Sequence, residues 1–152
     1  MLTPDPQSVK EQAPASPSPQ VVEFMRRDAL AQHLGIELVE MRLGLARAAM
    51  TVGPQHLNAH GILHGGAVFT LADFAFAAAG NSHGQIALAL HVDINFLTTA
   101  PVGARLLAEA TEEYLGNRTA LYHMRVTTED GTLIAACHGM VYRKREQFLE
   151  SA

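Results

Sequence analysis

The residue most suited to chemistry is Asp73, a single acid inside a long apolar segment. Its neighbours share an apolar character: Phe69, Leu71, Ala72, Phe74, Ala75 and Phe76. A carboxylate in such surroundings loses much of its hydration, and proteins keep such a group where it is paired, hydrogen-bonded or chemically useful. Asp73 is therefore the first candidate for a reacting group, as a nucleophile or as a general base.

A second chemical group precedes Asp73 at the Gly65-Gly66 pair. This pair predicts the N-terminus of a helix that meets no strong breaker before Gly80. The first amides of a helix have no partner within it, and the macrodipole favours negative charge there. Because glycine has no side chain, a carbonyl oxygen can approach the Gly65 N–H, which could then stabilise an oxyanion. The alternative role of the glycines is a tight turn with close helix packing.

The spacing between these two groups predicts a site shared by two chains. Asp73 follows Gly65 by eight residues, or about 12 Å along a helix, which is too far for both groups to act on one carbonyl. A two-fold related, antiparallel helix would bring the Asp73 of one protomer near the Gly65 of the other. Edge strands of the two sheets could also join.

The remaining segments predict a sheet that positions this helix. Residues 21–35 have the apolar spacing of a short amphipathic helix closed by Gly35, and residues 36–52 alternate as two strands around Gly44. The central helix is apolar nearly all round and therefore needs cover on most sides. Four further strand-length segments supply that cover, at 86–97, 104–114, 119–128 and 132–142.

Turn signals between these segments favour an antiparallel meander. The strongest is Asp130-Gly131, because both residues tolerate the positive φ of a tight turn. The order of strands, one buried helix and more strands predicts an α+β fold in which a curved sheet wraps a central helix.

Composition narrows the class of protein. The chain has 152 residues, 48% of them hydrophobic, so a single domain over residues 21–145 is expected between tails at 1–20 and 146–152. The formal net charge of −4 gives no basic surface for nucleic acid. The first residues lack the apolar region of a signal peptide, and no segment is typical of a membrane span. The lone Cys137 is expected to be buried and inert, and a reducing cytoplasm is the expected compartment.

The motif Asn58-x-x-Gly61-x-x-His64-Gly65-Gly66, with an acid eight residues after the first glycine of the pair, resembles a known family. The chain is similar to the hotdog-fold acyl-CoA thioesterases of the phenylacetate-degradation type from about residue 35 to 143. The resemblance implies hydrolysis of an acyl-CoA to a free acid and CoA, with an aryl-acyl or medium-chain acyl group. It also implies dimers, commonly paired into tetramers, and no cofactor or metal.

The same resemblance suggests roles for single residues. Gly65 would be the oxyanion donor and Asp73 the nucleophile or base. Asn58 and His64 match polar residues around the thioester, although each could equally form or cap the local turn. Gly66 belongs to the same binding turn, and Arg118 with Thr119 matches a place where the family often has a basic residue for CoA phosphates; Arg118 could equally be an idle surface charge.

The sequence also contains a possible metal-binding spacing and a basic cluster, and it leaves two alternative functions open. The spacing of His56, His60 and His64 would align three metal ligands on a helix, but Pro54 and several glycines interrupt it, so no metal site is expected. The basic cluster 143–145 is expected to be solvated. A hydratase on the same fold, or a non-catalytic acyl-CoA binding module, are the alternative functions.

Overall fold

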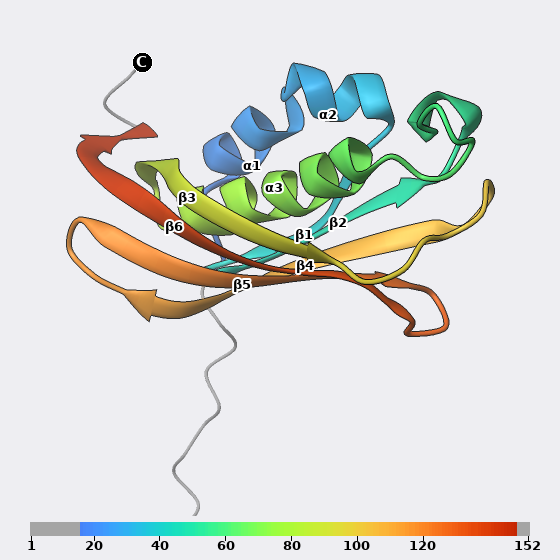
Figure 1. Ribbon diagram of the computed structural model, residues 1–152. Helices are drawn as coiled ribbons and strands as arrows, with labels where there is room; N and C mark the ends of the chain where they lie inside the picture. The colour runs from blue at the N-terminus through green and yellow to red at the C-terminus, as the bar shows by residue number, and fades with distance from the viewer. Residues whose placement is uncertain (1–15, 149–152) are drawn as a thin grey trace, which may run out of the picture.

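The computed structural model describes residues 16–148. One long helix lies against the concave face of an antiparallel six-stranded sheet, and two short helices cover that helix from the opposite side (Figure 1). The α+β architecture expected from the sequence is confirmed. The helices are α1 (Pro19–Arg26), α2 (Ala29–Leu34) and α3 (Gly65–Asn81), and the strands are β1 (Glu37–Arg42), β2 (Leu45–Thr51), β3 (Gln85–Phe96), β4 (Arg105–Leu115), β5 (Thr119–Thr128) and β6 (Leu133–Gln147).

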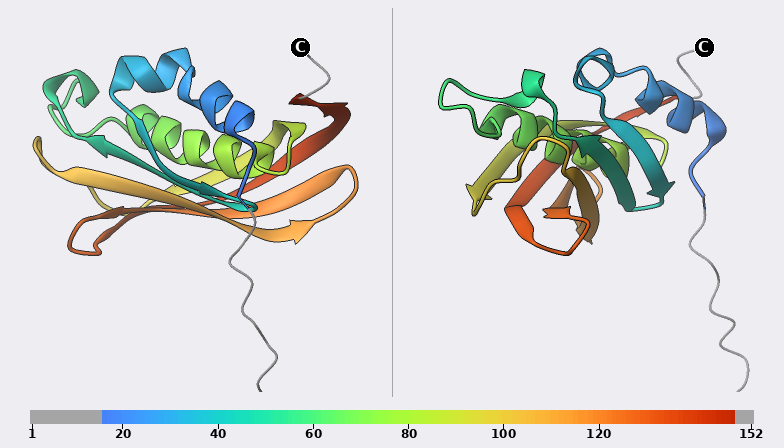
Figure 2. Two further views of the ribbon diagram at one scale, coloured as in Figure 1. Left: turned by 180° about the vertical axis from the view of Figure 1, so that it is seen from behind. Right: turned by 90° about the vertical axis from the view of Figure 1, so that its right-hand side faces the viewer.

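The sheet has the strand order β1-β2-β4-β5-β6-β3, so β1 and β3 form its two edges. Gly44 and Gly131 take the positive φ values of 74° and 88° that the β1–β2 and β5–β6 turns require. Strand β3 follows α3 directly along the chain but pairs with the last strand, β6. The two views in Figure 2 show how the sheet curves around α3. The edge strand β3 therefore runs back along the helix that precedes it.

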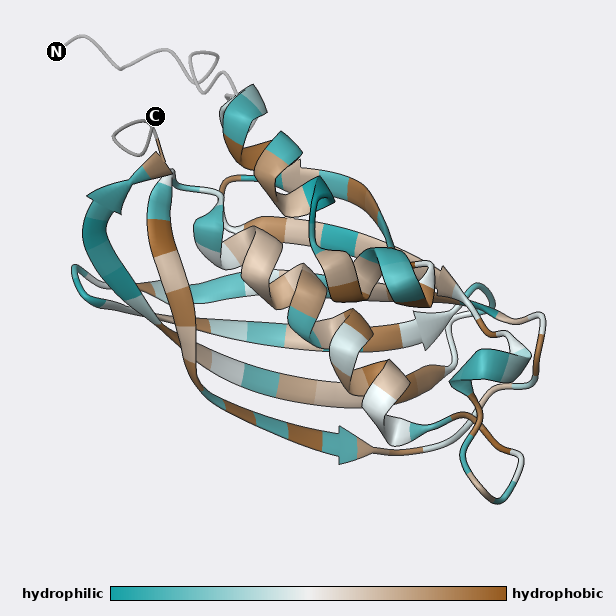
Figure 3. Ribbon diagram, turned by 90° about the horizontal axis from the view of Figure 1, so that it is seen from above, coloured by the Kyte–Doolittle hydropathy of each residue, from teal (hydrophilic) through white to brown (hydrophobic). Residues whose placement is uncertain are grey.

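Helix α3 forms the centre of the hydrophobic core (Figure 3). The Phe76 ring packs edge-on against Tyr122 of β5, with ring centroids 5.7 Å apart. Gly139 of β6 lies directly under the same ring, because a Cβ at this position would stand 2.7 Å from the Phe76 ring. The apolar surface of α3 is therefore matched by a sheet that leaves room for its aromatic side chains.

The N-terminal segment differs from the single helix that we expected over residues 21–35. The structure has two helices, because Asp28 interrupts the first and caps the second: its Oδ1 accepts a hydrogen bond from the Ala31 N–H at 2.9 Å. Gly35 ends α2 with a φ of 72°, as the sequence indicated. The break allows α1 and α2 to lie over different parts of α3 (Figure 2).

Both ends of the expected domain run slightly further than predicted. Helix α1 begins at Pro19, and β6 continues to Gln147, which pairs with Gln85 of β3. Arg143 is buried rather than solvated, because its guanidinium donates a 2.7 Å hydrogen bond to the Gly116 carbonyl. Residues 1–15 and 149–152, which include most of the expected tails, lie outside the described residues. Within residues 16–148, no helix has the length and hydropathy that crossing a bilayer requires.

Candidate active site

The N-terminus of α3 presents one backbone amide without a partner. His64 is the N-cap residue: its Nδ1 accepts the Gly66 N–H at 2.7 Å, and its carbonyl oxygen accepts the Ala67 and Val68 N–H groups at 3.0 and 3.3 Å. Among residues 16–148, the Gly65 N–H donates to no acceptor. The cap therefore satisfies the neighbouring amides and leaves the Gly65 N–H available to a ligand.

The loop before α3 is held by Asn58. Its Oδ1 accepts hydrogen bonds from the N–H groups of His60 and Ile62 at 2.9 and 3.3 Å, and its own N–H donates to the Ile62 carbonyl at 2.8 Å. The side-chain oxygen is thus committed to the turn. Its Nδ2 donates to no group among the described residues, so this amide is the part of Asn58 that could still contact a ligand.

His56 is a structural residue of the same region. It is buried, its Nδ1 accepts the Gly53 N–H at 2.9 Å, and its Nε2 lies 2.8 Å from the Leu34 carbonyl. Because Nδ1 accepts, Nε2 carries the proton and donates to Leu34, which ties this loop to the end of α2. No group of three or more metal-ligating side chains is found in the described part of the chain.

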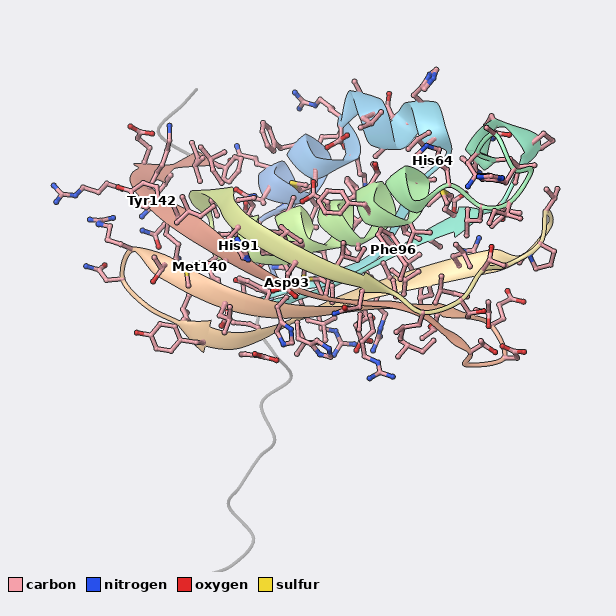
Figure 4. All side chains as sticks on the ribbon, viewed as in Figure 1. His64, His91, Asp93, Phe96, Met140 and Tyr142 are labelled. Carbon is pink, nitrogen blue, oxygen red and sulfur yellow. The ribbon has the colours of Figure 1, made fainter. Side chains whose placement is uncertain are left out.

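An open cavity lies beside Gly65. Phe96, at the end of β3, covers this glycine: a Cβ on Gly65 would be 3.2 Å from the Phe96 ring. Figure 4 shows Phe96 and His64 at the same end of α3. The cavity has a volume of about 390 Å³ and is lined by Ile62, Leu63, Gly65, Val68 and the segment 96–99. Gly65 therefore borders a cavity that is open to solvent.

Asp73 lies two helical turns further along α3 and is half-buried. Burial raises the pKa of its carboxyl group above the ordinary aspartate value, and the negative charge of Asp28 raises this pKa further. Asp28 is a neighbour that sequence reasoning missed. Its proximity to Asp73 depends on how α2 packs over α3, which the expected single helix over residues 21–35 did not indicate.

The structure does not bring Arg118 and Thr119 to the Gly65 end of α3 within one protomer. Arg118 donates to the Arg143 carbonyl at 3.3 Å, Arg143 pairs with Ala87, and the Ala87 N–H donates to Asn81 at the C-terminal end of α3. Gly65 is at the opposite end of this 17-residue helix, about 24 Å away along the axis. Arg118 is thus on the far side of Asp73 from Gly65.

A buried polar network fixes the C-terminal end of α3. The Ser82 hydroxyl donates to the Ala79 carbonyl at 2.6 Å and accepts the Gly44 N–H at 2.8 Å. Glu112 accepts hydrogen bonds from Tyr122 and His83, both at 2.7 Å. Burial raises the pKa of the Tyr122 hydroxyl, so this residue remains a proton donor to Glu112. These contacts join the C-terminal end of α3 to the β1–β2 turn and to strands β4 and β5.

The fold and this arrangement define the class of protein, a hotdog-fold thioesterase. The chain belongs to the thioesterase superfamily, whose family model matches residues 60–135. This matched region contains the cap of α3, Asp73, strands β3 to β5 and the first residues of β6. Hydrolysis of a thioester is the chemistry of this class.

Comparison with individual proteins shows which members of the thioesterase superfamily this chain resembles. A putative esterase of Archaeoglobus fulgidus is 46% identical over 129 residues, which is 84% of each chain. The acyl-coenzyme A thioesterase PaaI of Escherichia coli is 39% identical over 116 residues, 76% of this chain and 83% of PaaI. The solved structure of E. coli PaaI superposes with a TM-score of 0.81 and 35% identity over 84% of this chain and 93% of that one. The smu.793 protein of Streptococcus mutans, solved bound to acetyl CoA, superposes with a TM-score of 0.70 and 25% identity over 74% and 90% of the two chains.

Proposed function

We propose that this protein is an acyl-CoA thioesterase whose active site is formed by Gly65 of one protomer and Asp73 of another. The observation that carries the proposal is the pairing of an unpartnered helix N-terminal amide with a half-buried carboxylate on the same rigid helix. The likeness to E. coli PaaI and to the acetyl CoA complex supports CoA esters as substrates.

In the proposed reaction, the thioester carbonyl oxygen accepts the Gly65 N–H. The negative charge that develops on this oxygen is stabilised by the amide and by the positive end of the α3 dipole. The Asp73 carboxylate either attacks the carbonyl carbon or removes a proton from a water that does so. In both routes the C–S bond breaks, the sulfur leaves as CoA, and one water is consumed to give the free acid.

Asn58 and His64 serve mainly to shape the site in this proposal. His64 caps α3 and thereby orients the free Gly65 amide, while Asn58 holds the loop and offers its Nδ2 to the thioester or to water. Gly66 allows the close approach of substrate to the same turn. Arg118 and Thr119 are candidates for CoA phosphate binding only where another protomer brings them to the site.

The edge strand β3 is the surface through which we expect two protomers to join. The other edge, β1, is short and carries charged side chains, which discourage pairing. Strand β3 has 12 residues and exposes Leu88, Leu90 and Phe96, together with the polar His91 and Asp93, along a free edge. A free edge of this length can pair with an antiparallel copy of itself.

The position of the expected two-fold axis along α3 and β3 follows from the helix geometry. For Gly65 to reach the partner's Asp73, the axis must cross α3 midway between these residues, about 6 Å from the helix start. Phe96 marks that start on β3 because its ring covers Gly65. At about 3.3 Å per residue, the same 6 Å corresponds to roughly two strand residues. The axis is therefore expected close to Ile94.

The proposal is tested by thiol release from a panel of aromatic and aliphatic acyl-CoA esters. The purified protein should hydrolyse at least one ester, and Asp73→Asn should reduce kcat by about 10³-fold or more, as loss of an essential nucleophile or base does. Circular dichroism and size-exclusion chromatography control for folding and assembly. Tight binding without thiol release would identify a binding module instead, and full activity of the Asp73→Asn protein would refute the assignment.

A further inference from the structure

A second cavity lies at the other half of α3, between α1 and the start of β3. Its volume is about 540 Å³, within the usual range of about 300–1,000 Å³ for small-molecule sites. Phe24 and Met25 contribute from α1, Ala77 and Asn81 from α3, and Ala87 from β3. Figure 1 shows α1 above the C-terminal half of α3, beside the first residues of β3.

This cavity is continuous with the face of α3 that carries Asp73. Asp73, Ala77 and Asn81 are four residues apart in turn, so they lie one above another on the helix surface, about 6 Å from one to the next. Asp28, whose charge acts on the Asp73 carboxyl group, also lines the cavity. The cavity therefore opens about one helical turn from the candidate reacting group.

Most of the cavity surface is apolar, and the polar side chains Gln20, Arg27 and Asp28 line it on the side of α1 and the α1–α2 junction. Phe24 and Phe148 meet edge to face, with ring centroids 4.8 Å apart. Asn81 Nδ2 donates to the carbonyl oxygens of Ala77 and Ala87 at 2.8 and 3.2 Å, and its Oδ1 accepts the Ala87 N–H at 2.9 Å. Because these polar atoms are already bonded, Asn81 closes the cavity without attracting a charged or hydrogen-bonding ligand.

We propose that this cavity holds the acyl group of the substrate, with helix α1 as the wall that selects it. The inference rests on the proposed function. A thioester carbonyl placed at Asp73 would direct its acyl chain along Ala77 toward Asn81, a path of about 12 Å. Such a path suits an octanoyl or phenylacetyl group and leaves acetyl with few contacts.

The experiment compares acyl groups rather than absolute rates. For each protein, kcat/KM for octanoyl-CoA and kcat/KM for phenylacetyl-CoA are each divided by kcat/KM for acetyl-CoA. The proteins compared are the wild type, Ala77→Leu and Phe24→Ala. Ala77→Leu fills the cavity, and this ratio should fall about 10-fold or more, since discrimination in an apolar pocket is worth about 1–3 kcal/mol. Phe24→Ala removes an apolar wall and should lower the ratio about threefold or more.

Leu30→Ala on α2 is the matched control, because Leu30 is 54% exposed, close to the 52% of Phe24, and does not line the cavity. Its ratio should stay within about twofold of the wild type, as for an ordinary surface substitution. The proposal is overturned if Ala77→Leu and Phe24→Ala leave the ratio unchanged or lower all three rates in parallel. Since Phe24 is on the surface, its variant keeps the test decisive where Ala77→Leu does not fold.

Calorimetric affinities separate this inference from the proposed function. The affinities of octanoyl-CoA and acetyl-CoA are measured for the Asp73→Asn protein, with and without Ala77→Leu. Their ratio reports the preference for the longer acyl group without any turnover. An affinity ratio that falls with Ala77→Leu supports the acyl cavity even where the wild type releases no thiol. An unchanged affinity ratio in a protein that does release thiol refutes the cavity and leaves the thioesterase assignment standing.

Discussion

The sharing of one site between two protomers can be tested by mixing two inactive proteins. Gly65→Pro removes the proposed oxyanion donor with little change to the helix, because proline is favoured at the first helical position. The preceding residue, His64, already has the extended ψ of 130° that a following proline requires. Asp73→Asn removes the proposed nucleophile or base and keeps the shape of the side chain. Each protein alone should be nearly inactive.

Random pairing of the two variants fixes the expected magnitude. About half of the dimers in an equal mixture contain one subunit of each kind, and in these one of the two sites combines an intact Gly65 with an intact Asp73. The mixture should therefore recover about one quarter of the wild-type activity per subunit. A site built within one protomer would recover none, because every subunit in the mixture carries a defect.

The assay is thiol release after partial unfolding and refolding of the mixture, with subunit exchange measured by native mass spectrometry. Gly65→Ala is the matched control, since it adds the same Cβ next to the Phe96 ring, 3.2 Å away, but keeps the N–H. It should retain much more activity than Gly65→Pro. No recovery of activity in a mixture with verified heterodimers would refute the shared site, and equal losses in both Gly65 variants would refute the role of the amide.

Four further outcomes are expected. His64→Asn keeps a capping acceptor and should retain most activity, whereas His64→Ala should destabilise the fold by about 1 kcal/mol and lower activity; equal, large losses in both would indicate that the imidazole takes part in the reaction. Asp28→Asn keeps the α2 cap but removes the charge that raises the pKa of Asp73, so the acidic limb of the pH–rate profile should move to lower pH; an unmoved limb would contradict this coupling. In a Cys137→Ala background, which removes the thiol paired with position 94 on β6, Ile94→Cys should form a cross-linked dimer under mild oxidation, whereas Glu129→Cys in the exposed β5–β6 turn should not; no dimer from Ile94→Cys would contradict the expected axis. Finally, Asp73→Asn should raise Tm at neutral pH, and an equal or lower Tm there would contradict the burial argument.

The sign of this last effect follows from the raised pKa of Asp73. The folded protein holds the Asp73 proton more tightly than the unfolded chain, so the free energy of unfolding falls as pH rises through the interval between the unfolded and the folded pKa. Above that interval the ionised carboxylate is a destabilising group, and asparagine avoids its desolvation. Below the ordinary aspartate pKa both states are protonated, and the difference in Tm between wild type and variant should disappear.

Local signals in the sequence were sufficient for the central helix and most of the strands. The Gly65-Gly66 pair and the apolar run after it predicted α3 nearly to its last residue, because both ends depend on nearby residues alone. Gly44 and Asp130-Gly131 predicted two turns for the same reason. The buried position of Cys137 also followed from its small apolar neighbours.

Features that depend on tertiary packing could not be read from the sequence. Strand β6 extends to Gln147 because it pairs with the start of β3, a contact between distant segments. Arg143 is buried because a carbonyl of the β4–β5 turn accepts its guanidinium proton. The roles of His64 as cap or ligand were left open by spacing alone, and the 2.7 Å bond from Gly66 favours the cap. The cavity under α1 required the packing of three elements.

The geometry of α3 is the reason for proposing that the chemistry takes place between subunits. A straight helix that supplies both an amide at its first residue and a carboxylate two turns later keeps them about 12 Å apart, and no local motion of α3 can close that distance. Bending α3 would break the contacts of Phe76 with Tyr122 and of Ser82 with Gly44, which hold the C-terminal half of the helix against the core. An antiparallel copy of the helix closes the distance at no cost to the core. In the proposed mechanism, dimerisation through β3 is a requirement of the reaction geometry, and substitutions that separate the protomers should abolish thiol release while each fold stays intact.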